Sequence, residues 1–356
     1  MKSIAIAAAA IALPLAAQEP DNAAPSPGEI VAEAGADEWI AIAPDDLVVM
    51  ELAPRADGTE RKVVIQLMPA PFSQGWVENV RTLARTGYWE GSSVNRVQDN
   101  YVVQWGQPDP GTGGVEKPVP EGLRAMGEEA YTAPFTPGMF EYSYDRWGRG
   151  PAIRPNAPMA RNMKAPEPPD YSDPYAGYVG FAAGFPVGMN YELDREYPID
   201  GFTQGAFVPD EVWPVHCYGM VGVGRDLSPN TGDGSQLYTV IGQAPRHLDR
   251  NIALVGRIIA GIEHLSSLTR GSGPLGFYTE EEASLRTPIR SVRVASDLPA
   301  DRRPEFEYLD TDGSTFLRYT EARANRRDPF FNVPAGGADI CNIPVPVRAI
   351  AESAAG

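Results

Sequence analysis

Three residues that could act together, Arg96, Tyr101 and Gln104, stand in the valine-rich, strand-like run VNRVQDNYVVQ. In one straight strand Arg96 and Gln104 would share a face, because side chains alternate from one residue to the next. They would also lie roughly 26 Å apart at about 3.3 Å per residue, too far for one small site. Asp99-Asn100 is a turn-prone pair. We therefore predict a turn there that brings the three side chains to one place.

Metal-dependent and covalent chemistry have little support elsewhere in the chain. The sequence has two cysteines and the three histidines His216, His247 and His264, with neither a CxxC nor an HExxH pattern for a zinc site. It has no GxSxG elbow either, so a secreted hydrolase would need a nucleophile–base pair that we do not find. We expect no metal and no cofactor.

The charge of the chain restricts its partners. It carries 30 Lys and Arg against 47 Asp and Glu, a formal net charge of −17, which becomes −18 if Lys2 is removed. Such an excess of negative charge argues against nucleic acid or an anionic membrane surface as partner.

The N-terminus has the pattern of a secretory signal peptide. A short positive region at Lys2, an apolar stretch and small residues at Ala16-Ala17 predict cleavage after residues 1–17. The alternative is a membrane anchor, but the apolar run ends at Pro14 and is shorter than the ~20 residues of a spanning helix. We expect an exported protein, periplasmic or secreted, without membrane insertion after cleavage. Residues 18–44, rich in Ala, Pro, Glu and Asp, are predicted to be a flexible leader.

The two cysteines leave two interpretations. In an oxidising compartment Cys217 and Cys341 form a disulfide. Otherwise they are two separate buried thiols. The distance between their Cα atoms decides, and sequence does not supply it.

Most of the remaining chain reads as short strands separated by turn signals. Asp57-Gly58 marks a hairpin between two β-branched runs, and Trp76, Val80 and Leu83 lie at helical spacing after Ser73, a candidate N-cap. Further strands are predicted at 93–97, 101–106, 218–224, 236–242, 252–259 and 289–296, with a short helix at IEHLSSL. Many short strands and two short helices indicate a mainly β protein, a closed barrel or a sandwich.

Two segments have a different character. Residues 107–215 are rich in Pro, Gly and aromatics without sustained periodicity, and they predict an insertion of turns and short pieces. In the tail, FEYLDTDGSTFLRYTE predicts a strand–turn–strand unit around Asp312-Gly313. The spacing of Asp310, Asp312 and Glu321 faintly suggests a calcium loop instead, but Gly313 comes two places early for one.

Several of these pieces together resemble the cyclophilin-type peptidyl-prolyl isomerases. Glu78-Asn79 to Leu83 is similar to the family pattern EN-F-x-x-L, and Arg96, Tyr101 and Gln104 fit its F-H-R-x-x-x-x-F-x-x-Q run. The later block SPNTGDGSQLYTVIGQAPRHLDRNIALVGRIIAGIEHL resembles G-P-N-T-N-G-S-Q-F-F-I … W-L-D-G-x-x-x-V-F-G-x-V-x-x-G. The pieces stand in the family's order and cover about 45–112 and 216–297.

The resemblance implies a closed eight-stranded antiparallel β-barrel capped by two short helices, with a surface groove for proline-containing peptide. The implied domains are the barrel at 45–297, interrupted by a long irregular insertion at 113–215, and a C-terminal extension at 298–356. Arg96 matches the catalytic arginine, Tyr101 a phenylalanine of the proline pocket, and Gln104 a glutamine that holds peptide backbone. The substrate-binding positions of the family fall at Gly224, Arg225, Gln236, Tyr238, His247 and Leu248.

The chain departs from the family at several of these positions. Both pocket phenylalanines are tyrosines, Arg225 replaces an asparagine, and Ile252 stands where a pocket histidine is usual. His247 replaces the tryptophan linked to cyclosporin binding, so the resemblance implies weak affinity for that drug. Asp233 is an extra residue in the NTNGSQ loop. The insertion between the two blocks lies on the groove side of related barrels, where it extends or covers the site.

Two functional hypotheses follow from the resemblance. The first is a peptidyl-prolyl cis-trans isomerase that acts on X–Pro bonds of unfolded or extended exported proteins and assists their folding. The second is a catalytically weak peptide-binding or chaperone module with the same fold, favoured by the altered pocket and the insertion. Oligomeric state and client proteins stay open.

Overall fold

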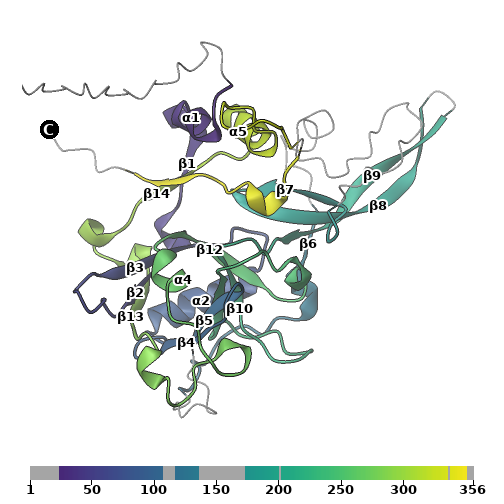
Figure 1. Ribbon diagram of the computed structural model, residues 1–356. Helices are drawn as coiled ribbons and strands as arrows, with labels where there is room; N and C mark the ends of the chain where they lie inside the picture. The colour runs from purple at the N-terminus through teal and green to yellow at the C-terminus, as the bar shows by residue number, and fades with distance from the viewer. Residues whose placement is uncertain (1–23, 107–116, 136–172, 200–201, 336, 351–356) are drawn as a thin grey trace, which may run out of the picture.

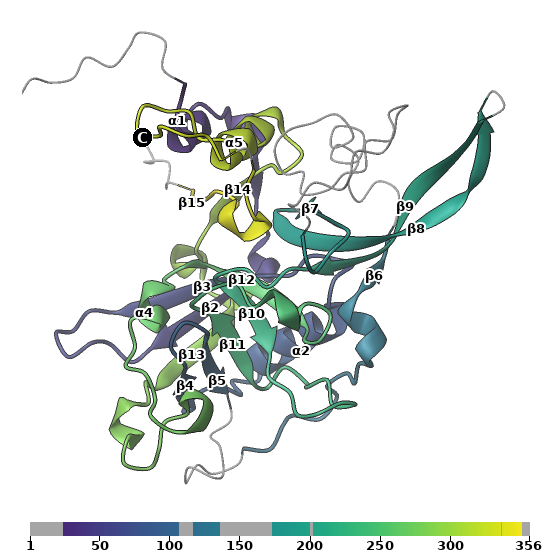
Figure 2. The ribbon, with the colours of Figure 1, turned by 45° about the vertical axis from the view of Figure 1, so that its right-hand side comes forward.

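The computed structural model describes residues 24–106, 117–135, 173–199, 202–335 and 337–350. The predicted signal peptide at 1–17 lies outside the described residues. Figures 1 and 2 show a barrel, a small layer of helices and strands formed by both ends of the chain, and a long hairpin that projects from the body. Within the described ranges, no helix is both long enough and apolar enough to cross a membrane.

The central element is an eight-stranded antiparallel barrel, as the resemblance to the cyclophilins implied. Its strand order is β13-β2-β3-β12-β10-β11-β5-β4. The barrel is nearly closed between its two end strands, where the Ser92 carbonyl accepts the Ile289 N–H at 2.8 Å and Ser93 forms a bridge with Pro288. The strands are β2 (Leu47–Leu52), β3 (Arg61–Leu67), β4 (Ser93–Val97), β5 (Val102–Gly106), β10 (Met220–Val223), β11 (Leu237–Val240), β12 (Leu254–Ala260) and β13 (Ile289–Val294).

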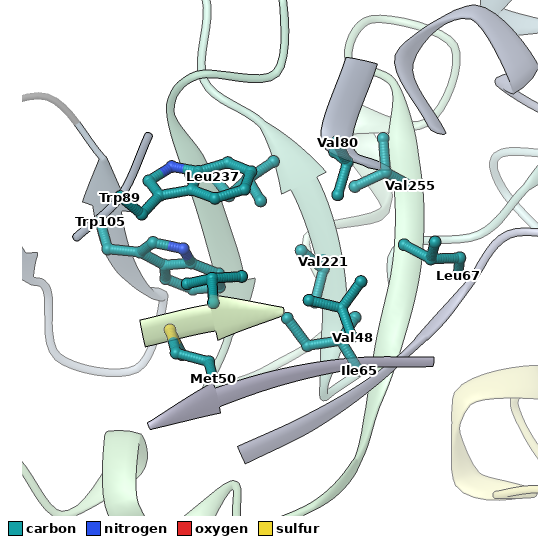
Figure 3. A pocket seen from close by; sticks show the side chains of 11 residues that line it. Val48, Met50, Ile65, Leu67, Val80, Trp89, Trp105, Val221, Leu237 and Val255 are labelled. Atoms are coloured by element: carbon teal, nitrogen blue, oxygen red, sulfur yellow. The ribbon is translucent and has the colours of Figure 1, made fainter. Parts of the chain in front are cut away.

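The interior of the barrel is a packed apolar core. Trp89 and Trp105 lie side by side with Leu237 above the side chains of β2 and β3 (Figure 3). The cavity that remains between them is about 10 Å³, which is barely the size of one water molecule. A ligand must therefore bind on the outside of the barrel.

Two short helices cover the barrel, as predicted. Helix α2 (Gln74–Arg85) buries Trp76, Val80, Leu83 and Ala84 on one face, and α4 (Glu263–Ser266) is a single turn. Ser73 occupies the N-cap position of α2, as predicted, but its side chain makes no capping hydrogen bond.

The prediction of a flexible leader at 18–44 was wrong for residues 24–44. Helix α1 (Pro27–Ala32) starts with a capping box between Ser26 and Glu29, and β1 (Trp39–Ala41) pairs with β14 (Phe306–Leu309). Although the segment is polar overall, it contains a few apolar side chains that are buried against the C-terminal extension: Ile30, Trp39 and Ile42. A third strand, β15 (Val347–Ala349), completes the sheet β1-β14-β15.

The predicted strand–turn–strand unit around Asp312-Gly313 was also wrong. The turn leads into helix α5 (Ser314–Ala324), which packs beside α1 (Figures 1 and 2). Phe316, Thr320 and Ala324 recur at helical spacing and are buried, which outweighs the β-propensity of the run. At the candidate calcium loop, the Asp310 carboxylate accepts the Asp312 N–H at 3.0 Å, and no cluster of metal-ligating side chains occurs in the described residues.

The insertion contains a sheet that the sequence did not reveal. Its strands are β6 (Ala133–Pro134), β7 (Tyr178–Ala182), β8 (Phe185–Ile199) and β9 (Phe202–Pro214), in the order β6-β9-β8-β7. The outer part of the β8–β9 hairpin extends well beyond the other two strands (Figure 2). Just after β9, Cys217 forms a disulfide with Cys341, with 5.0 Å between the Cα atoms. The bond joins the start of the barrel's second half to the C-terminal extension.

Candidate functional site

The predicted turn at Asp99-Asn100 is present and pairs β4 with β5. Arg96 and Gln104 are direct cross-strand partners, and the Gln98 N–H donates to the Val102 carbonyl at 2.9 Å. Asn100 has a φ of 49°, a left-handed conformation that asparagine tolerates better than most residues. Because of this turn, Arg96 and Gln104 make a direct side-chain contact although they are eight residues apart in sequence.

Arg96 is held from several sides. Its Nη1 donates to Oε1 of Gln104 at 3.1 Å, its Nε donates to the Leu275 carbonyl at 2.7 Å, and its Nη2 donates to Gln98. The guanidinium carbon also lies 5.7 Å from the centroid of the Tyr101 ring. Burial lowers the pKa of Arg96 below its usual value, yet an arginine stays charged in proteins. The result is a fixed, charged donor at the rim of the barrel.

Gln104 connects this arginine to the second block of the resemblance. Its Nε2 donates to Oε1 of Gln236 at 2.8 Å, because β5 pairs with β11 and its neighbouring loop. The Gln236 carbonyl in turn accepts the Gly224 N–H at 2.8 Å. Two side-chain amides and one arginine thus form a continuous polar row.

This row lies at the edge of a groove of about 1020 Å³ on the outside of the barrel. Gln104, Gln236, Gly224, Arg225 and Phe277 all contribute to its lining. The opposite part is formed by 123–126 and 229–233. Residues 123–126 belong to the insertion, so the insertion extends the groove.

The loop and the insertion segment that line the groove are anchored to α2. The buried side chain of Asn79 donates to the carbonyls of Asp233 and Arg124, each at 2.9 Å, and its Oδ1 accepts the Arg124 N–H at 2.8 Å. Trp76 donates through Nε1 to the Gly232 carbonyl at 2.9 Å. The helix therefore fixes the shape of the groove as well as covering the barrel.

Tyr238 and Tyr101 belong to a small apolar cluster beside the polar row. Tyr238 packs with Val102 and Val240, and Tyr101 and Ile252 lie against them. Tyr238 is opposite Gly222 in the β10–β11 register, and a Cβ atom on that glycine would lie 2.3 Å from the tyrosine Oη. Only a glycine there lets the ring lie across β10.

The remaining predicted site residues occupy a neighbouring loop. His247 and Leu248 lie in the short helical turn η5 (Arg246–Leu248), with His247 exposed and Leu248 half-buried. Neither contributes to the lining of the groove. Arg225 reaches this loop, because its Nε donates to the Asn251 carbonyl at 2.9 Å.

No family model and no curated protein matches the chain. Among solved structures, a cyclophilin from Hirschia baltica superposes with a TM-score of 0.56 and 23% sequence identity, and the match covers 87% of this chain and 93% of that one. The chain has the cyclophilin fold. A cyclophilin-type peptidyl-prolyl cis-trans isomerase from Cryptosporidium parvum, solved in the presence of the dipeptide Ala-Pro, matches 70% of this chain and 98% of its own with 13% identity and a TM-score of 0.33.

Within this cyclophilin fold, the sequence missed three contributors to the site. Phe277 and Leu275 come from the loop after α4, and the Phe277 backbone forms an isolated bridge with Arg96. His216 lies behind Tyr238 and is hydrogen-bonded to it. Neither loop residue belongs to a motif or a periodic run, so no local signal pointed to them. The Glu78-Asn79 pattern did point to Asn79, but not to its role as an anchor.

Proposed function

We propose that this protein is a peptidyl-prolyl cis-trans isomerase that acts on X–Pro bonds of exported polypeptides and assists their folding. The observation that carries the proposal is the position of Arg96. A charged guanidinium is fixed against Gln104 and Tyr101 and next to an apolar cluster, and its contact partners Gln104 and Phe277 line the groove. That arrangement suits a reaction in which one amide bond rotates and no bond breaks.

The chemistry explains why an arginine suffices. Amide resonance gives the X–Pro bond a rotation barrier of ~18–20 kcal/mol, and uncatalysed exchange takes tens of seconds or longer. In the twisted state the prolyl nitrogen is pyramidal and has a usable lone pair. A donor aimed at that nitrogen stabilises the twisted amide and not the planar one, which is the requirement for catalysis. One such donor contributes on the order of 3–4 kcal/mol in other enzymes.

Arg96 retains donors for this role. Three of its N–H groups bind Leu275, Gln98 and Gln104, while a guanidinium offers five. Gln104 and Gln236 donate and accept, which suits holding the flanking peptide groups still while one bond turns. The cluster around Tyr101, Tyr238 and Ile252 offers an apolar surface for the pyrrolidine ring.

The proposed export has independent support. The Cys217–Cys341 disulfide is typical of proteins that fold outside the cytoplasm. Together with the signal-peptide pattern at 1–17, it favours a periplasmic or secreted protein. Exported chains with exposed prolines would then be the substrates.

The decisive experiment is exchange NMR on a short Ala-Pro peptide with the wild type and Arg96→Ala. We expect the wild type to accelerate cis-trans exchange and Arg96→Ala to lose most of the acceleration, about 100- to 1000-fold if the donor contributes as above. Arg290→Ala, in which a half-exposed barrel arginine loses only a 3.8 Å ion pair with Glu60, is the matched control and should behave as wild type. Unaccelerated exchange with the wild type would reject the enzymatic function.

A second function, a peptide-binding module with weak catalysis, is favoured by one observation. The groove is lined by Gln104, Gln236 and the insertion residues 123–126, but Arg96, Tyr101 and Tyr238 are not among its lining residues. A peptide held there need not present its X–Pro bond to the arginine. Binding of the Ala-Pro peptide without acceleration would support this second function.

A further inference from the structure

The hydroxyl group of Tyr238 is hydrogen-bonded inside the protein. Its Oη lies 2.9 Å from Nε2 of His216, whose side chain is fully buried. The two rings are nearly parallel, with an interplanar angle of 12° and centroids 6.4 Å apart. The hydroxyl that distinguishes this residue from the phenylalanine of the family pattern is therefore already engaged, away from the groove.

The partners of His216 determine which of its nitrogens carries the proton. Nδ1 lies 2.9 Å from Oδ1 of Asp249, and the same oxygen accepts the His216 backbone N–H at 2.9 Å. A carboxylate only accepts, so Nδ1 donates and Nε2 presents a lone pair. It follows that the Tyr238 hydroxyl donates to Nε2, and that His216 requires a donor at position 238.

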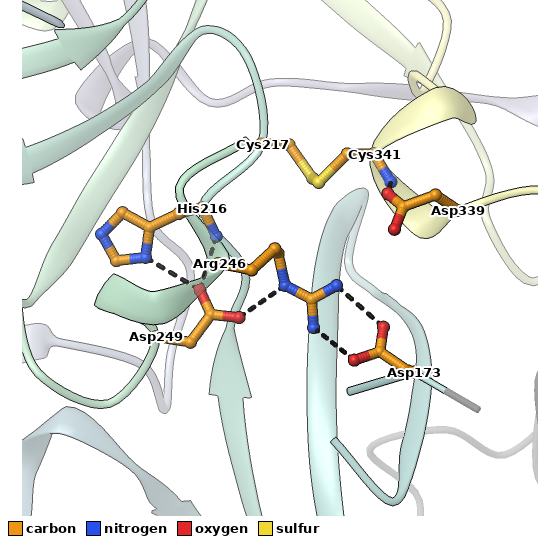
Figure 4. The surroundings of a disulfide bond; sticks show 7 residues. All are labelled: Asp173, His216, Cys217, Arg246, Asp249, Asp339 and Cys341. Atoms are coloured by element: carbon orange, nitrogen blue, oxygen red, sulfur yellow. Dashed lines mark hydrogen bonds and ion pairs between the residues drawn. A yellow bond between two sulfur atoms is a disulfide. The ribbon is translucent and has the colours of Figure 1, made fainter. Parts of the chain in front are cut away.

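Asp249 is itself fixed by a charged chain that reaches the insertion. Its Oδ2 accepts from Nε of Arg246 at 2.6 Å, and the two Nη atoms of Arg246 bind the Asp173 carboxylate at 2.8 and 3.1 Å (Figure 4). The side chains of Arg246, Asp249 and Asp173 are each at most 4% exposed. Buried charges persist in proteins when each one is paired, and the loss of a partner is strongly destabilising. The chain therefore holds His216 in one orientation.

We propose that His216 is a positioning residue for the X–Pro ligand: it fixes the Tyr238 ring against Tyr101 and Ile252, and Asp249, Arg246 and Asp173 fix His216. This inference rests on the proposed function for the identity of the ligand. It also assigns the insertion a role at the site, because Asp173 lies within it. Position 238 then requires a tyrosine and not a phenylalanine, because Nε2 of His216 needs the hydroxyl as a donor.

Two substitutions separate this role from a merely structural one. His216→Asn keeps a side-chain donor near the Nδ1 position for Asp249 and removes the acceptor for Tyr238. His216→Gln places an acceptor near the Nε2 position and removes the donor to Asp249. If His216 positions Tyr238, His216→Asn should weaken peptide binding more than His216→Gln does. If His216 only holds Asp249 in place, His216→Gln should weaken binding more. His264→Asn, at a partly exposed histidine on α4, is the matched control.

The test is an NMR titration of the full chain with an Ala-Pro peptide, alongside thermal unfolding to confirm that each variant is folded. We expect His216→Asn to weaken binding about tenfold, since a buried hydroxyl loses its acceptor, and His216→Gln by less than about threefold. In a Tyr238→Phe background the asparagine substitution should weaken binding no further. Equal binding by wild type and His216→Asn, or the same loss in both backgrounds, overturns the positioning role.

A measurement on the unsubstituted protein keeps the inference testable if the variants do not fold. In the ¹⁵N spectrum of the histidine side chains, Nδ1 of His216 should carry the proton, and the Tyr238 hydroxyl proton should couple to Nε2. A protonated Nε2 at neutral pH overturns the inference. Wild-type protein that neither binds nor isomerises the peptide rejects the proposed function instead, so the two failures differ.

Discussion

The guanidinium of Arg96 lies against the ring of Phe277, and the backbones of the same two residues form an isolated bridge. Phe277 also lines the groove. The residue that the resemblance identifies as catalytic is thus in contact with a side chain from outside any family motif. A cation over an aromatic face contributes about 0.5–2 kcal/mol, and here it also restricts where the guanidinium can point.

Phe277→Ala is therefore expected to lower kcat/KM for an Ala-Pro peptide about five- to tenfold, because the arginine loses one of the contacts that orient it. Phe277→Tyr keeps the ring and should retain most of the activity. Phe330→Ala, at an aromatic residue that is 83% exposed, serves as control. If Phe277→Ala and Phe277→Tyr accelerate exchange equally in the NMR measurement, the contact between Phe277 and Arg96 does not contribute to catalysis.

Gly222→Ala tests the position of Tyr238 from the other side. The new Cβ would lie 2.3 Å from the tyrosine Oη, so the ring must move away from β10 and from His216. Overpacking of this kind destabilises by about 1–3 kcal/mol, and peptide binding should weaken together with stability. Gly28→Ala in α1 has open space around the new atom and should be neutral or slightly stabilising. Denaturant unfolding and peptide titration of both variants provide the comparison, and wild-type behaviour of Gly222→Ala would contradict the geometry.

The Arg96–Gln104 contact could be predicted from the sequence because it depends on a local pattern. The turn at Asp99-Asn100 alone places Arg96 opposite Gln104. Short strands with turn signals left a closed barrel or a sandwich open, and only the resemblance to the cyclophilins implied the eight-stranded barrel. The resemblance placed Gln104 and Gln236 at the same site, but their contact was not predicted, because it joins segments far apart in sequence.

The failures have physical causes as well. The polar composition of the leader predicted that it is flexible, but Trp39 and Ile42 are buried against the C-terminal extension, which a local pattern does not show. The run after Gly313 has β-branched and aromatic residues, which favour a strand. It nevertheless forms helix α5, whose buried residues recur at helical spacing, and α1 packs beside it. His216 and Phe277 contact residues far away in the sequence, and such contacts leave no periodicity in it.

The Cys217–Cys341 disulfide should contribute substantially to stability. It closes a loop with a sequence separation of 124 residues, and the loss of a disulfide in proteins lowers the free energy of unfolding by about 2–5 kcal/mol. We expect the double variant Cys217→Ala/Cys341→Ala to unfold at a lower urea concentration than wild type. Dithiothreitol should lower the midpoint of wild type and leave that of the variant unchanged. A wild-type midpoint that dithiothreitol does not alter would show that the bond is absent or without effect.

Acid should weaken the fold through His216. Complete burial lowers the pKa of His216 below its usual 6.5, and this outweighs the neighbouring Asp249, whose charge is shared with Arg246. In the unfolded chain the His216 imidazole takes up a proton at about pH 6.5, whereas in the folded chain it does so only at a lower pH. The contribution of His216 to stability is therefore complete above that pH and declines as the pH falls below it. Protonation would also turn Nε2 into a donor facing the Tyr238 hydroxyl.

The measurement is the free energy of unfolding in urea between pH 7 and 5 for wild type, His216→Gln and His264→Gln. The wild type and His264→Gln should lose stability on acidification with similar slopes. His216→Gln should show a shallower slope below pH 6.5, because it lacks the buried group that must remain neutral. Parallel curves for all three proteins would mean that His216 takes up its proton equally in both states. The neutral imidazole inferred from its contacts with Asp249 and Tyr238 would then be wrong.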